Sequence, residues 1–214
     1  MTAVDLMIFD FDGTLVDTGE DLANSVNHTL RAFNLAEKPF HEIMSYIGEG
    51  VRRLLEKSLG PGNCDNLEEA KEIFMGYYSK HLLDHTRLYP GVMEVLRHFA
   101  SKPKWIVTNK TFTFTELIAR RLEILHDFEG IIGIDSIAVA KPDAEVVQSI
   151  IERYGIQSDR TVVVGDGVQD IEMAKNAGAW SCAFLNGLGT RETLMRLRPD
   201  FCCESIEELK GLFC

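Results

Sequence analysis

The chain has 214 residues, of which 45% are hydrophobic and 26% charged, and its net charge at pH 7 is −11. A chain of this length and composition can bury a substantial core, which excludes disordered, collagen-like and coiled-coil proteins. Its negative charge repels nucleic acids and anionic membrane surfaces, so we expect neither as a partner, and an anionic substrate would need a local cation.

The N-terminal segment, residues 1–12, contains three aspartates and no basic run, unlike a secretion signal. Within it, Val4 to Phe9 form an apolar run of strand length that ends at Asp10. Charged residues interrupt every apolar run well before the roughly 18 residues that a membrane span requires. The five cysteines form no C-x-x-C pair and are typical of reduced thiols. We therefore expect a cytoplasmic location.

Residues 18–83 show helical periodicity, with apolar residues three or four positions apart. Thr18 and Asp21 resemble a capping box and predict the beginning of the first helix. Gly48 and Gly50 would each cost a helix about 1 kcal/mol relative to alanine, so they predict a loop between two helices.

After the turn at Pro90 and Gly91, helices and strands alternate. Helices are expected over 92–100, 112–125, 144–154 and 170–177, and strands over 105–107, 131–134, 161–164 and 180–185. Such alternation predicts an α/β fold with a doubly wound parallel sheet, a Rossmann-like core. Because the helical block follows the first strand, it forms an inserted all-helical cap. We expect the core to comprise residues 1–15 and 88–214, and the cap residues 16–87.

Polar residues follow four of the expected strands, at the edge where doubly wound sheets bind ligands. Asp10 and Asp12 follow the first strand, and Gly13 lets the backbone turn tightly and present N–H groups to an anion. The later strands end in polar residues too: Thr108, Asn109 and Lys110, then Lys141, then Asp166 and Asp170.

The carboxylates at this edge need a cation. Asp10 and Asp12 project to the same side of an extended strand, and Asp166 and Asp170 are expected on one face at the start of a helix. Mg²⁺ favours one or two carboxylates together with phosphate oxygens, and Lys141 would supply the remaining positive charge. The sequence therefore predicts a Mg²⁺ site that receives a phosphate group.

These four segments resemble, in the same order, the four motifs of the haloacid dehalogenase-like hydrolase superfamily. Asp10 to Leu15, DFDGTL, is similar to the first motif and is a strong signal, and the four motifs in this order are very specific. Thr108–Lys110 is similar to the second, Lys141–Pro142 to the third and Gly165–Asp170 to the fourth. The resemblance covers residues 5–186 and implies a helical cap inserted after the first motif.

The resemblance also implies catalytic roles. Asp10 would be the nucleophile that becomes an aspartyl-phosphate. Asp12 would protonate the leaving alcohol and then activate the water that breaks the intermediate. Thr108 and Asn109 would hold the phosphoryl oxygens, and Lys141 would stabilise both the phosphate and the nucleophile.

A metal site is implied in the same way. Mg²⁺ would be bound by Asp10, the carbonyl of Asp12 and Asp166, with Asp170 as a ligand directly or through water. Gly167 stands where many relatives have Ser or Thr, which removes a side-chain hydrogen bond but no carboxylate.

Residues 47–55 resemble the cap loop of phosphoglycolate phosphatases. Gly50 and Arg52 would contact the substrate there, and either Arg52 or Arg53 would bind a substrate carboxylate. An equally weighted alternative is that both arginines lie on a solvated helix face. Phe114 and its neighbour Phe112 are expected to pack rather than to bind substrate.

The predicted function is hydrolysis of a small phosphorylated metabolite, 2-phosphoglycolate or a similar phosphomonoester. A phosphosugar mutase stays open, although no cap residue stands out as its acid-base group. A phosphonatase would need a cap lysine, for which Lys57 is a candidate. A phosphoaspartate signalling module of the receiver type is the alternative from another class, but receivers have no inserted cap. A homodimer is compatible with the sequence.

Overall fold

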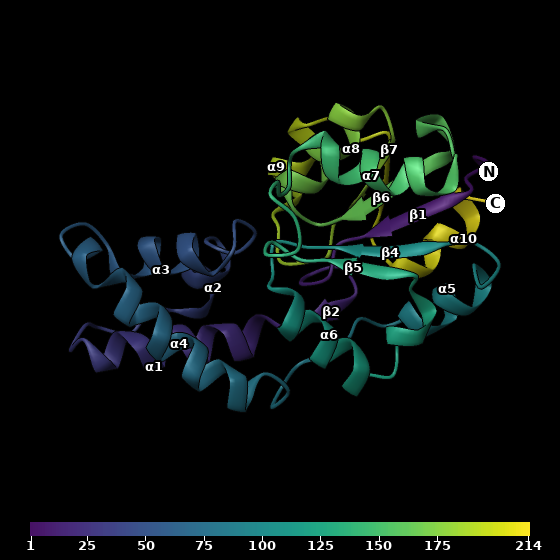
Figure 1. The fold of residues 1–214 in the computed structure, drawn as a ribbon. Helices are drawn as coiled ribbons and strands as arrows, with labels where there is room; N and C mark the ends of the chain where they lie inside the picture. Colours follow the sequence, from purple (N-terminus) through teal and green to yellow (C-terminus); the bar gives the residue numbers. More distant parts are fainter.

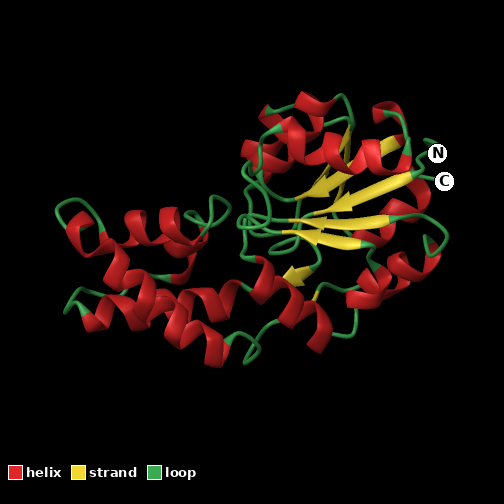
Figure 2. Cartoon of the chain, in the orientation of Figure 1, coloured by secondary structure: helices red, strands yellow, loops and turns green.

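The computed structural model describes residues 1–214, apart from the side chain of Cys64. Its larger part is a parallel sheet with the strand order β5-β4-β1-β6-β7-β8 (Figures 1 and 2). The strands are β1 (Leu6–Phe9), β4 (Lys104–Val107), β5 (Gly130–Ile132), β6 (Thr161–Gly165), β7 (Trp180–Phe184) and β8 (Phe201–Cys203). The predicted Rossmann-like α/β core is therefore confirmed.

The central strand β1 is apolar throughout because helices cover both faces of the sheet. Met7 and Phe9 belong to a hydrophobic cluster with residues of α5 (Val92–His98) and α6 (Phe112–Arg121). Leu6 and Ile8 belong to a second cluster, with residues of α7 (Ala144–Tyr154) and α8 (Val168–Ala177). Successive strand residues point to opposite faces, so one short strand anchors both layers.

A second group of helices lies beside the carboxyl ends of the strands, toward which the strand arrows point (Figure 2). It contains α1 (Gly19–Ala32), α2 (Phe40–Met44), α3 (Val51–Leu59) and α4 (Leu67–His81). The chain enters this group through β2 (Val16–Asp17) and leaves it through β3 (Arg87–Leu88), and these two strands pair antiparallel. The helices form the expected cap, while the boundaries at 15/16 and 87/88 stay a prediction.

Two local predictions about the cap have different outcomes. Gly48 and Gly50 lie between α2 and α3 with positive φ, as the loop prediction requires. The capping box is wrong: Thr18 precedes α1, but its hydroxyl donates to Asp12 Oδ1 at 2.8 Å instead of capping the helix. Asp21 accepts hydrogen bonds from the returning linker, so it does not cap the helix either.

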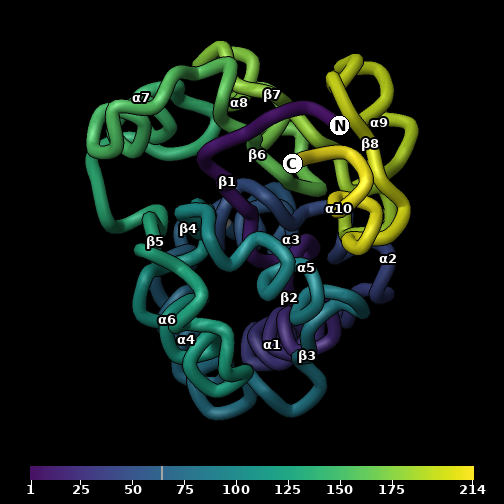
Figure 3. The backbone as a smooth tube through the Cα atoms, turned by 90° about the vertical axis from the view of Figure 1, so that its right-hand side faces the viewer, coloured from purple at the N-terminus to yellow at the C-terminus, as the bar shows by residue number. Residues whose placement is uncertain are grey.

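The last 29 residues contain elements without a clear sequence signal. These are α9 (Arg191–Arg196), β8 and α10 (Leu209–Leu212), each too short to show a period. The two ends of the chain meet beside them (Figure 3): the amide of Thr2 donates to the carbonyl of Leu212 at 2.7 Å. Across the described residues, none of the helices combines the length and apolar character that a bilayer span requires.

Candidate active site

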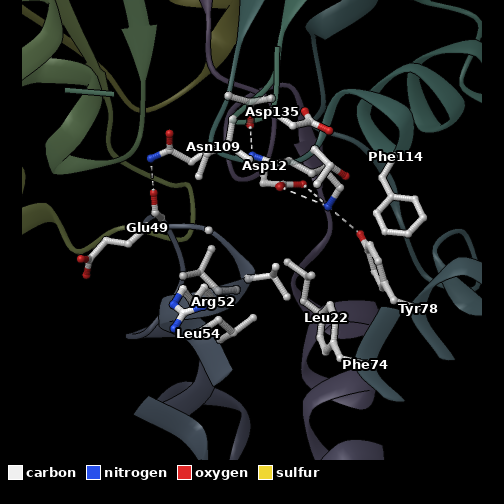
Figure 4. Close-up of a pocket in the computed structure, with 18 of the residues that line it drawn as sticks. Asp12, Leu22, Glu49, Arg52, Leu54, Phe74, Tyr78, Asn109, Phe114 and Asp135 are labelled. Atoms are coloured by element: carbon white, nitrogen blue, oxygen red, sulfur yellow. Dashed lines mark hydrogen bonds and ion pairs between the residues drawn. The ribbon is translucent and has the colours of Figure 1, made fainter. Parts of the chain in front are cut away.

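The polar residues expected at the strand ends lie along one edge of the sheet. Asp10 and Asp12 follow β1, Thr108 follows β4 and Asp166 follows β6, while Lys141 comes from the loop after β5. This edge faces the cap, and a cavity of about 280 Å³ lies between them (Figure 4). The strand topology thus gathers groups that are far apart in the sequence.

Three carboxylates and one ammonium form the centre of the site. Asp10, Asp166 and Asp170 each offer an oxygen, and these atoms lie within 4.8 Å of one another. The Lys141 Nζ atom lies 2.7 Å from Asp10 Oδ1 and 2.7 Å from Asp170 Oδ1. All four side chains are buried. The predicted convergence of these four residues is therefore what the structure contains.

The cluster is short of positive charge. Burial, followed by the charge of Asp170, raises the pKa of Asp10 to about 7. Burial and the charge of Asp10 raise the pKa of Asp166 to about 7 as well. Burial alone would lower the pKa of Lys141, but Asp10 and Asp170 outweigh it and raise that pKa above its usual value. A further cation would therefore stabilise the ionised carboxylates.

Asp166 is fixed by hydrogen bonds from two loops. Its Oδ1 accepts from the Thr14 hydroxyl at 2.7 Å, and its Oδ2 accepts from the amides of Leu188 and Gly189 at 2.8 and 3.1 Å. Gly13 has φ +86°, and a Cβ there would lie 2.2 Å from Asp166 Oδ2. The glycine is thus required by close approach as well as by backbone conformation. None of these three contacts with Asp166 was predicted from the sequence, although Thr14 belongs to the first motif.

The expectation that Asp166 and Asp170 share one face of a helix is wrong. Asp166 precedes α8, because Gly167 at the N-cap is still extended (φ −104°, ψ 156°). Asp170 lies in the first turn, where its Oδ2 accepts from the Gly167 amide at 2.9 Å and its Oδ1 from Lys141. The two carboxylates converge through the strand-to-helix turn and not through helical spacing.

The Asp12 carboxylate lies in different surroundings. Its Oδ1 accepts from the hydroxyl of Thr18, and both of its oxygens lie 3.2 Å from the Nζ atom of Lys110. Lys110 also donates to the hydroxyl of Tyr78 on α4 at 2.7 Å. From the sequence Lys110 had only a place in the second motif, and neither the contact of Thr18 with Asp12 nor that of Tyr78 with Lys110 was predicted. The (i, i+3, i+7) spacing of Lys71, Phe74 and Tyr78 was the available signal for a helix face turned toward the site.

Thr108 and Asn109 line the cavity beside Asp10. The Asn109 Nδ2 atom donates to the carbonyl of Gly48 in the cap at 2.8 Å, and its Oδ1 is buried with no hydrogen-bond partner among the described residues. A Cβ on Gly50 would lie 3.2 Å from the Asn109 carbonyl oxygen. The cap loop therefore packs directly on the segment that follows β4.

The two cap arginines are equally exposed, at 62 and 61% of their side chains, as the solvated-face alternative expects, and they differ in whether they line the cavity. Arg52 lines the cavity and pairs with Glu56 and Glu68 at 3.2 and 2.9 Å. Arg53 pairs with Glu56 at 2.8 Å and is not among the described residues that line the cavity. Phe114 lines the cavity with its ring edge-on to Tyr78. The structure brings Gly50 and Arg52 to the cavity and leaves Arg53 outside it.

The chain belongs to the haloacid dehalogenase-like hydrolase family. That family's model, "Haloacid dehalogenase-like hydrolase", matches residues 7–184, from the central strand through β7. The family resemblance of the four motifs is thereby confirmed, and the protein is an enzyme of the hydrolase class.

Named relatives match between about four fifths and nearly all of the chain. The phosphoglycolate phosphatase of Nitrosospira multiformis is 36% identical over 180 residues, which cover 81% of this chain and 79% of the relative. That of Vibrio cholerae is 30% identical over 220 residues, covering 98% and 96%. A crystal structure described as a predicted phosphoglycolate phosphatase, from Haemophilus somnus, is similar with a TM-score of 0.94, at 27% identity and over 99% of both chains.

Proposed function

We propose that the protein is a Mg²⁺-dependent phosphomonoesterase of the cytoplasm that hydrolyses 2-phosphoglycolate or a similarly small phosphorylated metabolite. The observation that carries this proposal is the buried cluster of Asp10, Asp166, Asp170 and Lys141 at the edge of a cap-covered cavity. The substrate is suggested by the relatives, several of which are named phosphoglycolate phosphatase.

The carboxylate cluster fits a small, hard cation. Its donors are oxygens, they converge within 4.8 Å, and one lysine offsets only part of their charge. Asp10 and Asp166 would hold Mg²⁺ together with the carbonyl of Asp12, with Asp170 bound directly or through water. When bound, the ion neutralises the carboxylates and polarises the phosphoryl oxygens.

Asp10 is the nucleophile in this proposal. Its Oδ1 accepts hydrogen bonds from the Phe11 amide and from Lys141, each at 2.7 Å. Its Oδ2 has no hydrogen-bond partner among the described residues and is free to attack phosphorus. A bond forms between this oxygen and phosphorus as the bond from phosphorus to the alcohol oxygen breaks. Lys141 favours the ionised carboxylate against the effect of burial and would counter the charge on the transferred group.

Asp12 is the general acid and then the general base in this proposal. It donates a proton to the departing alcohol oxygen and later takes one from the water that hydrolyses the aspartyl-phosphate. Thr108 and Asn109, which line the cavity, would bind the phosphoryl oxygens, and the cap would keep bulk water away during transfer.

The test is phosphate release from a panel of phosphorylated metabolites, with Mg²⁺ and with EDTA. We expect 2-phosphoglycolate to show the highest kcat/KM, and EDTA to abolish turnover. Asp10→Asn should remove activity while the protein stays folded, because an amide is a poor nucleophile and a poor Mg²⁺ ligand. Asp5→Asn is the matched control, since Asp5 pairs with Arg160 at the partly exposed start of the core. Turnover retained in Asp10→Asn would contradict the mechanism.

A further inference from the structure

One buried cation near the site has no part in the carboxylate cluster. The ammonium of Lys110 contacts both oxygens of Asp12 at 3.2 Å and the hydroxyl of Tyr78 at 2.7 Å, and only 6% of its side chain is exposed. Figure 4 shows this chain of contacts crossing from the core to the cap. An ammonium has three protons to donate, so these partners account for its donors.

Tyr78 is held firmly on its helix. Its ring stacks on Phe74 one turn earlier on α4 and meets Phe114 edge-on, and the Lys110 Nζ atom lies 4.6 Å from the ring centroid. Burial, the largest effect, raises the pKa of Tyr78 to about 12, so the hydroxyl stays protonated. The tyrosine thus offers the lysine a neutral acceptor oxygen.

The Asp12 carboxylate therefore contacts both ends of the cap, one directly and the other through Lys110. Thr18, which binds Oδ1, directly precedes α1, and Tyr78, which binds Lys110, lies on α4. A displacement of α4 away from the core would remove a partner of Lys110, and Lys110 would then be free to leave Asp12.

We propose that Lys110 and Tyr78 are positioning residues that couple the closed cap to the orientation of the Asp12 carboxylate. This inference rests on the proposed function, in which Asp12 gives the proton to the leaving group. With the cap closed, Tyr78 holds the ammonium against Asp12, and the carboxylate is fixed toward the cavity. Protonation of the leaving group then depends on a cap that has closed over a substrate.

The first experiment compares Tyr78→Phe with wild type on two substrates. The variant keeps the ring and its packing but loses the hydroxyl. For an alkyl phosphate, which needs a proton on its leaving oxygen, we expect kcat/KM to fall about tenfold, the worth of a hydrogen bond to a charged group. For p-nitrophenyl phosphate, whose leaving group departs as an anion, the fall should be less than about twofold. The ratio kcat/KM is used because it reports the transfer to Asp10 and not the later hydrolysis.

Tyr46→Phe is the matched control. Tyr46 is another cap tyrosine whose hydroxyl makes one hydrogen bond, to Glu42 at 2.8 Å, and it does not touch Asp12. This variant should behave as wild type on both substrates. If Tyr78→Phe lowers kcat/KM equally for the two substrates, its role is structural and the proposal is overturned.

A second measurement tests whether the effect passes through Asp12. In an Asp12→Asn background, adding Tyr78→Phe or Lys110→Met should produce no further loss with the alkyl phosphate, whereas independent effects would multiply. Lys110→Arg, which keeps a cation, should lose less than Lys110→Met. If the losses in kcat/KM of the single variants multiply in the double variants, the inference is overturned and the phosphatase proposal stays intact. A wild-type protein that releases no phosphate from any substrate would overturn both.

Discussion

Asp10 and Asp12 are two positions apart, yet their surroundings assign them different chemistry. Asp10 lies against Lys141 and near Asp170, in a cluster where burial raises its pKa. Asp12 is turned to Thr18 and Lys110, outside that cluster. Burial alone would favour Asp10 as the acid, because it raises the pKa of that group; a cation at the cluster would return Asp10 to the ionised form that a nucleophile needs, and would leave Asp12, outside the cluster, as the acid-base group.

The role of Asp12 gives a prediction on leaving groups. Asp12→Ala should lower kcat for an alkyl phosphate by roughly 10²–10⁴, the usual contribution of a positioned proton donor. The loss in kcat/KM should shrink with p-nitrophenyl phosphate, because nitrophenolate leaves without protonation. Steady-state kinetics on the two substrates checks this. If kcat/KM falls equally for the alkyl phosphate and for p-nitrophenyl phosphate, Asp12 does not act as the acid.

At the scale of elements, the strands and helices with a strong period were predictable, and the contacts between distant segments were not. The apolar run before Asp10 and the β-branched run 161–164 are buried strands. By contrast, Thr18 and Asp21 have the residue types of a capping box, but tertiary partners compete for both side chains. The capping rule uses only neighbouring residues. It fails at Asp21 because the linker residue that binds it, Thr86, lies 65 positions away in the sequence.

The same reasoning explains what was found and missed in the site. Asp10, Lys141, Asp166 and Asp170 could be predicted because parallel strands end at one edge, whatever the details of packing. The contact of Tyr78 with Lys110 could not be predicted, because helical spacing indicates a face turned toward the site but not which core residue that face meets. For Arg52 and Arg53, adjacent in the sequence, the structure distinguishes the one that lines the cavity.

The buried partner of the cap linker gives a prediction on stability. Asp21 is almost fully buried and accepts from the amide and hydroxyl of Thr86 and from the amide of His85. Asp21→Ala leaves these donors without an acceptor and should lower the free energy of unfolding by about 2–3 kcal/mol. Glu20→Ala, at the exposed neighbouring position, is the control and should cost little. Urea denaturation of wild type and both variants gives the free energies of unfolding. If Asp21→Ala is as stable as Glu20→Ala, the hydrogen bonds of Asp21 do not stabilise the fold.

At the scale of the whole molecule, metal binding, charge and stability are linked. The pKa values of Asp10 and Asp166 rise from 3.8 to about 7 in the metal-free fold. A raised carboxyl pKa means that the folded state binds more protons than the unfolded state between these values. The stability that these groups contribute is therefore present at low pH and is lost as the pH rises through about 7.

Mg²⁺ should reverse this loss, because it binds the ionised carboxylates. We expect millimolar Mg²⁺ to raise the Tm by at least about 3 °C near pH 8, roughly the shift that 1 kcal/mol produces in a chain of this size, and by little near pH 5. Thermal melts with and without Mg²⁺ at the two pH values isolate this effect from other titrations. Asp166→Asn should lose the Mg²⁺-dependent shift. A shift that is equal at both pH values would count against the carboxylate site.

Selectivity among substrates also belongs to the whole molecule, because in the proposed function the core would contact the phosphoryl group and the cap would contact the rest of the substrate. A carboxylated substrate meets a protein of net charge −11, so it needs a cation in the cavity. Arg52 lines the cavity, and its exposed guanidinium also pairs with Glu56 and Glu68. Lys71 on α4 is the alternative cation, since it lines the same cavity.

Arg52→Ala should therefore lower kcat/KM for 2-phosphoglycolate by about tenfold or more, the worth of one hydrogen bond to a charged group, at roughly 1.5–3 kcal/mol. The same variant should leave p-nitrophenyl phosphate unaffected, because that substrate has no carboxylate. Arg53→Ala removes an equal charge one residue away, outside the cavity lining, and so controls for the change in net charge. If Arg52→Ala and Arg53→Ala behave alike while Lys71→Met loses activity on 2-phosphoglycolate alone, the carboxylate lies against α4. Parallel losses on both substrates would mean that Arg52 supports the cap fold and recognises no carboxylate.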